Sequence, residues 1–395
     1  MNRKTLIIIS SIFIIVVLGV VLYFYLNISS ITGPTTTDEG FPVGRPAGDM
    51  GDTTDQTGTT DGTDETTASI AKLQQISKDP VSGSVIINKI DGVDVFFTDR
   101  MTGHTLQTNL ENISLNNTTN TTIPKIYESI WSSKGDFTVL RYLKDETSVI
   151  QSFIGKVSSS SLVGKFLPIN ITQVATNPIG DKIFYLYNKT GSLGFITDSN
   201  LAVNKQVFSS PAKEWIVTWP KEDTLTFTTK ASASAQGYMF TFNTNTKSFD
   251  KVLGGLAGLT TLTNGDLTKT VYSESSGTSI RFYTYTHKTG EVKSISPVTL
   301  PEKCVWSKIN TNNIYCAVPK NIFSFAYPDV WYQGLVSFND EIWLIETDSG
   351  ETTLLNNLSG AFAGIDATNL QLDKNEEYLI FINKKDLQLW SLNLK

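Results

Sequence analysis

The chain has 395 residues, a formal net charge of −6, two cysteines and two histidines. With so few cysteine and histidine residues, we expect neither a metal site nor a cofactor. From Ala71 onward the numbers of acidic and basic residues are nearly equal. The sequence therefore has no basic field for nucleic acid. Aromatic residues make up 11% of the chain, and with abundant Thr, Ser, Asn and Gly they favour strands and turns over helices.

Residues 1–28 are predicted to form a short cytoplasmic segment and a membrane anchor. Arg3 and Lys4 precede residues 5–26, an uncharged run that is long enough to cross a lipid bilayer at about 1.5 Å per residue. A cleaved signal peptide is the alternative, but its apolar core has only about 7–15 residues. The uncleaved anchor predicts a single-pass protein of the cell membrane, with a cytoplasmic N-terminus and an extracytoplasmic remainder.

Residues 29–70 are predicted to be a disordered linker. They are rich in Thr, Asp and Gly, and they contain eight acidic residues and one basic residue, Arg45. A segment with so little apolar surface cannot offset the entropy of folding. A calcium loop is the alternative, but the fixed ligand positions and closing Glu of such a loop are absent.

Residues 71–395 are predicted to form an all-β, seven-bladed propeller. The clearest unit, Ile126–Lys156, contains three strand patterns, IYESIW, FTVLRYL and SVIQSFIGK, separated by the turns SSKGD and KDETS. The turn after the first strand recurs about every 43–45 residues, with one step of about 65, and such spacing is typical of four-stranded blades. The successive turns lie near Gly92, Gly135, Gly180, Asp223, Asp266, Thr311 and Asn375.

The last unit is one strand short, because the chain stops at Lys395 after its third strand. We expect Ala71–Ser77 to supply the missing outer strand, which would close the ring without leaving a free sheet edge. The alternative is that Ala71–Ser77 is only the entry to blade one and that contacts alone close the ring.

The sequence Trp131-Ser132-Ser133-Lys134-Gly135, followed by FTVLRYL, resembles the W-S-x-x-G motif of TolB-type, WD40-like propeller repeats. These repeats are related to the propeller of dipeptidyl peptidase IV, and Val305–Lys308 is a partial second copy. The order of anchor, acidic linker and propeller resembles single-pass envelope proteins of small-genome bacteria. TolB-type propellers bind partner proteins, whereas the peptidase propellers gate a hydrolase domain for which no sequence remains after Lys395. The resemblance therefore implies a binding role.

Blade six contains an aromatic insert, Pro319–Asp340, between its second and third strands. In a propeller the loops joining second to third strands share a face with the loops between blades, so the insert is expected to project from that face or cap it. Tyr and Trp dominate interface hot spots. The candidate partner-binding residues are Tyr327, Asp329, Trp331, Tyr332, Gln333 and Phe338. A self-packed loop, in which the aromatic side chains form a local core, is an equally open interpretation.

Cys304 and Cys316 lie in the same blade and would face each other if their strands form a hairpin about Asn310. An extracytoplasmic location favours oxidation, so we predict a cross-strand disulfide. Two buried thiols are the alternative.

Catalytic motifs are not found in the sequence: it has no G-x-S-x-G, H-E-x-x-H or phosphate-binding loop. His104 and His287 are predicted to lie in turns on opposite faces, and therefore not in one site. The first hypothesis is a non-enzymatic, membrane-anchored propeller that binds an envelope protein or a cell-wall component. The alternatives are a hydrolase or lyase that acts on glycans or lactones with channel carboxylates, and a structural spacer.

Overall fold

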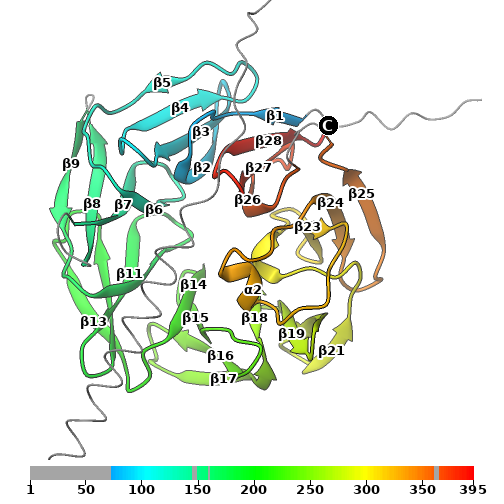
Figure 1. The fold of residues 1–395 in the computed structure, drawn as a ribbon. Helices are drawn as coiled ribbons and strands as arrows, with labels where there is room; N and C mark the ends of the chain where they lie inside the picture. The colour runs from blue at the N-terminus through cyan, green and yellow to red at the C-terminus, as the bar shows by residue number, and fades with distance from the viewer. Residues whose placement is uncertain (1–72, 145–148, 159–160, 360–363) are drawn as a thin grey trace, which may run out of the picture. The chain divides into compact units, whose positions relative to one another are not determined.

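The computed structural model describes residues 73–395, apart from 145–148, 159–160 and 360–363. Seven four-stranded antiparallel sheets surround a central channel in this part of the chain, which confirms the predicted seven-bladed propeller (Figure 1). The predicted anchor (1–28) and linker (29–70) lie outside the described residues. Among the residues that are described, no helix is long and apolar enough to cross a membrane.

Blades one to four take their strands in chain order from the inside of the ring outward. Their strands are β2 (Val81–Lys89), β3 (Gly92–Asp99), β4 (Thr105–Asn109) and β5 (Asn116–Asn117); β6 (Ile126–Trp131), β7 (Phe137–Leu143), β8 (Ile150–Ser158) and β9 (Ser161–Phe166); β10 (Ile171–Thr176), β11 (Lys182–Asn188), β12 (Ser192–Asp198) and β13 (Asn204–Ser210); and β14 (Trp215–Lys221), β15 (Thr224–Thr229), β16 (Gln236–Asn243) and β17 (Phe249–Ala257).

Blades five to seven complete the ring, and blade six also contains two short helical elements. Their elements are β18 (Thr260–Thr263), β19 (Lys269–Ser276), β20 (Ser279–Thr286) and β21 (Glu291–Ser294); the 3₁₀ turn η1 (Pro301–Lys303), β22 (Cys304–Trp306), β23 (Asn313–Pro319), α2 (Asp329–Tyr332), β24 (Asp340–Glu346) and β25 (Thr352–Asn356); and β26 (Ala367–Leu372), β27 (Tyr378–Asn383) and β28 (Leu389–Asn393).

The second strand of each blade is largely buried because both of its faces are covered. In β27 all six residues are buried, and β7 is buried from Phe137 to Arg141. Neighbouring blades share their cores: Phe184 of blade three packs in one cluster with Trp215 and Phe227 of blade four. Continuous β-branched and aromatic runs are the pattern expected of strands covered on both faces.

The ring is closed by strand exchange, as the sequence predicted. β1 (Leu73–Gln75) pairs antiparallel with β28, with Leu73 opposite Leu392 and Gln75 opposite Trp390. Ile76 N continues the ladder by donating a 2.8 Å hydrogen bond to Leu389 O. The first strand of the described chain is therefore the outer strand of the last blade.

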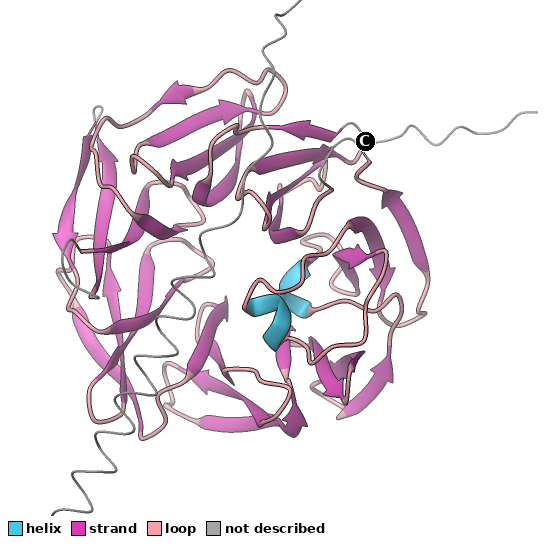
Figure 2. Ribbon diagram, in the orientation of Figure 1, coloured by secondary structure: helices cyan, strands magenta, loops and turns pink. Residues whose placement is uncertain are grey.

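The first strands of adjacent blades contact one another and form the wall of the channel. The loops that join second to third strands lie on the same face as the connections between blades, and the aromatic insert of blade six belongs to this set. Figure 2 shows its helix, α2, inside the ring of strands.

Candidate functional site

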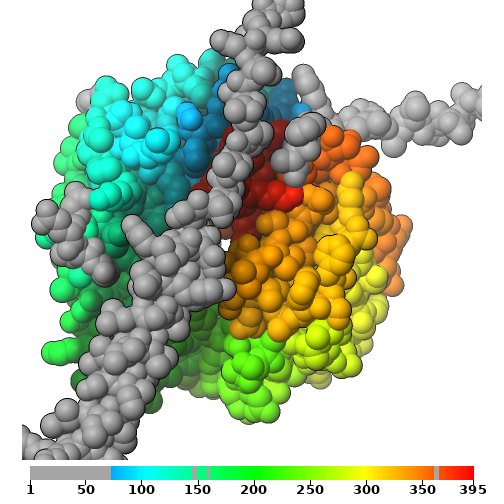
Figure 3. Space-filling view, in the orientation of Figure 1, coloured from blue at the N-terminus to red at the C-terminus, as the bar shows by residue number. Residues whose placement is uncertain are grey.

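The insert is bound to three other blades. Its hydrogen bonds to their loops are Ala233 N to Asp329 Oδ2 (2.6 Å, blade four), Phe325 N to Thr278 O (3.1 Å, blade five) and Lys384 Nζ to Trp331 O (2.8 Å, blade seven). In the space-filling view the orange surface of this segment is continuous with the neighbouring blades (Figure 3). The insert is therefore a fixed part of this face of the propeller.

A buried ionic cluster holds the insert from below. Lys303 Nζ lies 2.7 Å from Asp340 Oδ2 and 2.5 Å from Asp366 Oδ1, and all three side chains are fully buried. Asp366 also accepts hydrogen bonds from Trp331 Nε1 (3.0 Å) and from Phe338 N (2.9 Å). The Lys303 ammonium lies 5.4 Å from the ring centroids of both aromatic residues. One cation thus joins η1, the insert and the start of blade seven.

The cluster contains two buried carboxylates and one lysine, and the pKa of Asp340 is raised as a result. Burial raises the pKa of Asp340 to about 6, and the negative charge of Asp366 acts in the same direction, whereas Lys303 opposes both. Asp340 Oδ1 has no hydrogen-bond partner among the described residues.

Half of the predicted contact residues are interior residues, which corrects their assignment as a contact surface. Tyr327, Trp331 and Phe338 are 1%, 3% and 2% exposed, and they pack together in the core of the insert. This is the self-packed arrangement that the sequence left open. The physical reason is the buried ion cluster. Trp331 donates its indole N–H to Asp366, and the stacked rings of Trp331 and Phe338 cover the Lys303 ammonium and shield it from water.

The other three predicted residues lie differently. Asp329 is half-buried and accepts the hydrogen bond from blade four, whereas Tyr332 and Gln333 are exposed. The Tyr332 hydroxyl donates to Glu302 Oε1, and this contact fixes the direction of the ring. The desolvation of its hydroxyl end and the adjacent Glu302 carboxylate raise the pKa of Tyr332. Tyr332 is therefore the aromatic residue of the predicted set that remains available to a ligand.

Tyr332 faces a cavity of about 730 Å³ at the mouth of the channel. Its other walls come mainly from the starts of the first strands in blades one to four. They include Ser82, Tyr127, Glu128, Arg141, Ile171, Thr172, Gln173, Lys213, Glu214, Trp215, Lys230 and Asn369. Sequence reasoning missed these residues because each blade contributes only one to four of them. Their common signal is position: most lie at the first residues of a first strand.

Arg141 organises one side of the mouth although it is 6% exposed. Its Nη1 donates to Glu128 Oε2 (2.6 Å), its Nη2 donates to Ile171 O (3.0 Å), and its guanidinium lies 5.2 Å from the ring centroid of Tyr127. Burial raises the pKa of Tyr127 to about 12. The remaining donor, Arg141 Nε, has no partner among the described residues.

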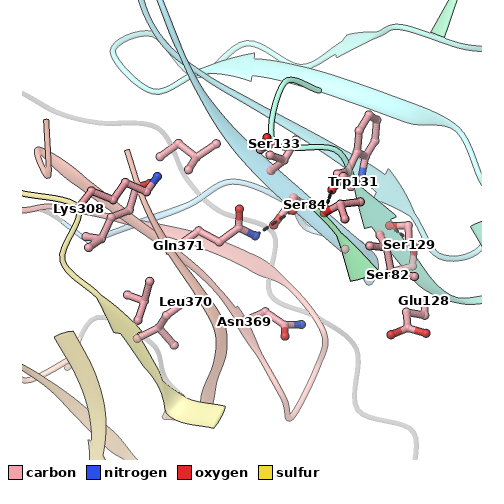
Figure 4. A pocket seen from close by; sticks show the side chains of 17 residues that line it. Ser82, Ser84, Glu128, Ser129, Trp131, Ser133, Lys308, Asn369, Leu370 and Gln371 are labelled. Atoms are coloured by element: carbon pink, nitrogen blue, oxygen red, sulfur yellow. Dashed lines mark hydrogen bonds between the residues drawn. The ribbon is translucent and has the colours of Figure 1, made fainter. Parts of the chain in front are cut away.

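A second cavity, of about 510 Å³, lies deeper in the channel and shares Ser82, Glu128 and Asn369 with the mouth (Figure 4). Its walls come from the first strands of blades one, two, three, six and seven. Blades one and two approach closely here, because Ser82 Oγ lies 3.1 Å from Ser129 Oγ and a Cβ on Gly83 would overlap Ser129 O. The two cavities therefore adjoin each other along the channel.

The predicted disulfide is present. Cys304 and Cys316 are directly opposite each other in the β22–β23 pair, and their sulfur atoms are 2.08 Å apart. β23 ends at Pro319, where the insert begins, so the cross-link secures the strand from which the insert emerges.

Metal ligands are not gathered anywhere in the part of the chain that the structure describes: no group of three or more His, Cys, Asp or Glu side chains is arranged to hold an ion. The two histidines have separate surroundings. His104 Nε2 lies 3.1 Å from the Thr122 hydroxyl, whereas His287 Nε2 lies 2.8 Å from that of Thr270, and burial lowers the pKa of His287.

Comparison with known proteins shows the fold alone. No protein-family model matches the sequence, and a search of curated proteins finds no relative. An oligogalacturonate lyase in complex with manganese superposes with a TM-score of 0.57 at 12% identity, over 83% of this chain and 94% of that one. The propeller domain of the Trilobed protease from Pyrococcus furiosus superposes with a TM-score of 0.52 at 14% identity, over 79% of this chain and 94% of that one.

TolB from Acinetobacter baumannii gives a TM-score of 0.44 at 11% identity, over 78% of each chain, a value too low to support an inference. The Pyrococcus propeller has an open velcro topology, whereas here β1 pairs with β28. These similarities extend to the propeller architecture and do not identify a ligand.

Proposed function

We propose that this chain is a non-enzymatic binding module whose ligand occupies the mouth of the channel beside the insert of blade six. The observation that carries the proposal is the way the insert is held. A fully buried ion cluster and hydrogen bonds to three other blades fix it, and it presents Tyr332 to a cavity of about 730 Å³. Such a volume lies within the range of about 300–1,000 Å³ that is typical of ligand sites.

We propose further that residues 5–26 anchor the chain in a lipid bilayer and that residues 29–70 tether the propeller outside the membrane. The support for this is the uncharged run after Arg3 and Lys4 and the acidic, Thr-rich composition that follows it. The ligand is then a component of the cell envelope, either a protein or a cell-wall polymer.

Catalysis by channel carboxylates is not favoured by the geometry of the mouth. Glu128 is paired with Arg141 at 2.6 Å, and Glu214 lies 3.5 Å from Lys230. A glycosidase-type mechanism needs one carboxyl group that stays protonated and one that stays ionised on either side of a bond. Two carboxylates that are each held by a cation do not provide this pair.

The test compares two exposed residues of the insert. Full-length protein would be incubated with an envelope fraction, and retained components would be compared for the parent, Tyr332→Ala and Leu335→Ala. Tyr332 lines the mouth, whereas Leu335 is 72% exposed and does not. We expect Tyr332→Ala to lose the ligand and Leu335→Ala to keep it, at equal circular dichroism and melting temperature. Equal retention by all three proteins would overturn the site, and retention by none would favour a spacer.

A further inference from the structure

We propose that the ligand of this site is a neutral oligosaccharide that extends from the mouth into the inner cavity of the channel. The proposal rests on the function proposed above and specifies its ligand. The inner cavity, of about 510 Å³, adjoins the mouth, because Ser82, Glu128 and Asn369 line both. A chain molecule can therefore occupy the two cavities together.

The inner cavity offers hydroxyl and carboxamide groups and no uncommitted charge. Its polar side chains include Ser82, Ser84, Ser129, Ser133, Asn369 and Gln371 (Figure 4). Two ionisable side chains, Glu128 and Lys308, line it as well. Glu128 is paired with Arg141. Lys308 Nζ donates to Leu372 O (2.6 Å), and the nearby carboxylates of Asp373 and Glu376 offset its charge. A ligand rich in neutral hydroxyl groups matches this lining better than an anion or a cation.

Polar atoms without partners mark where such a ligand would bind. Trp131 is 5% exposed and lines the inner cavity, yet its indole Nε1 has no hydrogen-bond partner among the described residues. The Ser84 hydroxyl of the same cavity also lacks a partner, as does Arg141 Nε beside the mouth. A buried donor that loses water without gaining an acceptor destabilises the fold. Sugar hydroxyl groups both accept and donate, and would give these covered atoms partners once the side chains around them shift to admit the ligand.

Aromatic side chains at the mouth provide flat apolar surfaces against which sugar rings can pack. Tyr332 is 37% exposed and Tyr127 is partly exposed, and both line the mouth, whereas Trp215 contributes only a narrow edge because it is 6% exposed. A sugar ring is apolar on its C–H faces and polar around its edge. It therefore fits a site that combines aromatic faces with a few placed hydrogen-bonding groups. An extended peptide also has polar edges, but its charged termini and side chains have no free counter-charge in the inner cavity.

The experiment is isothermal titration of the full-length protein with neutral hexasaccharides of the cello-, chito- and malto-series. Oligogalacturonate and an uncharged hexapeptide serve as comparison ligands. Ser84→Ala and Trp131→Phe remove unpartnered groups while keeping most of the side-chain volume. Ser279→Ala is the matched control, because its hydroxyl donates to Ser276 O (2.9 Å) and lines neither cavity.

We expect a neutral hexasaccharide to bind, with affinity reduced about fivefold by Ser84→Ala and by Trp131→Phe and unchanged in Ser279→Ala. Binding of oligogalacturonate or the peptide in place of the neutral sugars would overturn the ligand class while leaving the mouth as the binding site. Equal weakening by all three variants, or no binding of any neutral sugar, would also overturn the proposal. Sugar binding that Tyr332→Ala leaves unchanged would instead overturn the function proposed above.

Discussion

The substitution Lys303→Met tests whether the buried ion cluster holds the insert in place. Methionine keeps most of the apolar stem of the lysine but removes the ammonium that lies 2.7 Å from Asp340 and 2.5 Å from Asp366. Both carboxylates are fully buried, so water cannot solvate their charges when the ammonium is removed. Breaking a buried pair by removing one partner costs about 3–5 kcal/mol, and we expect a loss of this size in the free energy of unfolding at pH 7.

Chemical denaturation monitored by tryptophan fluorescence measures this loss. Lys320→Met is the matched control, because Lys320 lies 4.0 Å from Glu341 at a partly exposed site and such pairs contribute only about 0–1 kcal/mol. The double variant Lys303→Met/Asp366→Asn should recover part of the loss, since one uncompensated charge is removed. A loss below about 1 kcal/mol in Lys303→Met, equal to that of Lys320→Met, would refute the assignment of the cluster as the anchor of the insert.

Three further predictions concern stability. The double variant Cys304→Ala/Cys316→Ala should lose about 3 kcal/mol of unfolding free energy, from the entropy of a loop with sequence separation 12, and reductant should not destabilise it further. The pKa of Asp340 is raised to about 6 in the folded protein, so the folded state binds this proton more tightly than the unfolded state does. The resulting stabilisation is complete below the ordinary pKa of an aspartate and is lost as the pH rises through 6. Relative to Asp340→Asn, the parent should therefore lose up to about 3 kcal/mol between pH 4 and 7, and a difference that stays constant or rises with pH would contradict this. Gly83→Ala should cost about 1–3 kcal/mol, because its Cβ would overlap Ser129 O between blades one and two, and an unchanged denaturation midpoint would refute the close approach.

The propeller itself was predictable because its signal is repeated. Each second strand is covered by two neighbouring blades and is therefore largely buried, and apolar runs such as YLIFIN in β27 show this directly in the sequence. The lone segment before Val81 and the missing strand at Lys395 likewise predicted the pairing of β1 with β28. The disulfide between Cys304 and Cys316 was predictable because the two residues lie opposite each other in one local hairpin.

The site was predictable only in part, because burial of an aromatic residue depends on partners far away in sequence. Trp331 belongs to an exposed-looking loop, but Asp366 accepts from its indole and Lys384 donates to its backbone carbonyl. Neither residue is adjacent to the insert in the sequence. The lining of the mouth depends in the same way on where several blades meet, and no single blade carries a motif for it. Trp331 and Tyr332 were predicted alike from the sequence, and the structure buries the first and exposes the second.

Hydrogen–deuterium exchange of the full-length protein, with and without an excess of envelope fraction, tests the central claim most directly, because it maps bound surface without assuming the ligand. We predict slower exchange in the insert around α2 and at the starts of β6, β10 and β14, which line the mouth. Slower exchange confined to the outer strands, such as β9 and β13, with no change around α2, would contradict a ligand site at the mouth of the channel.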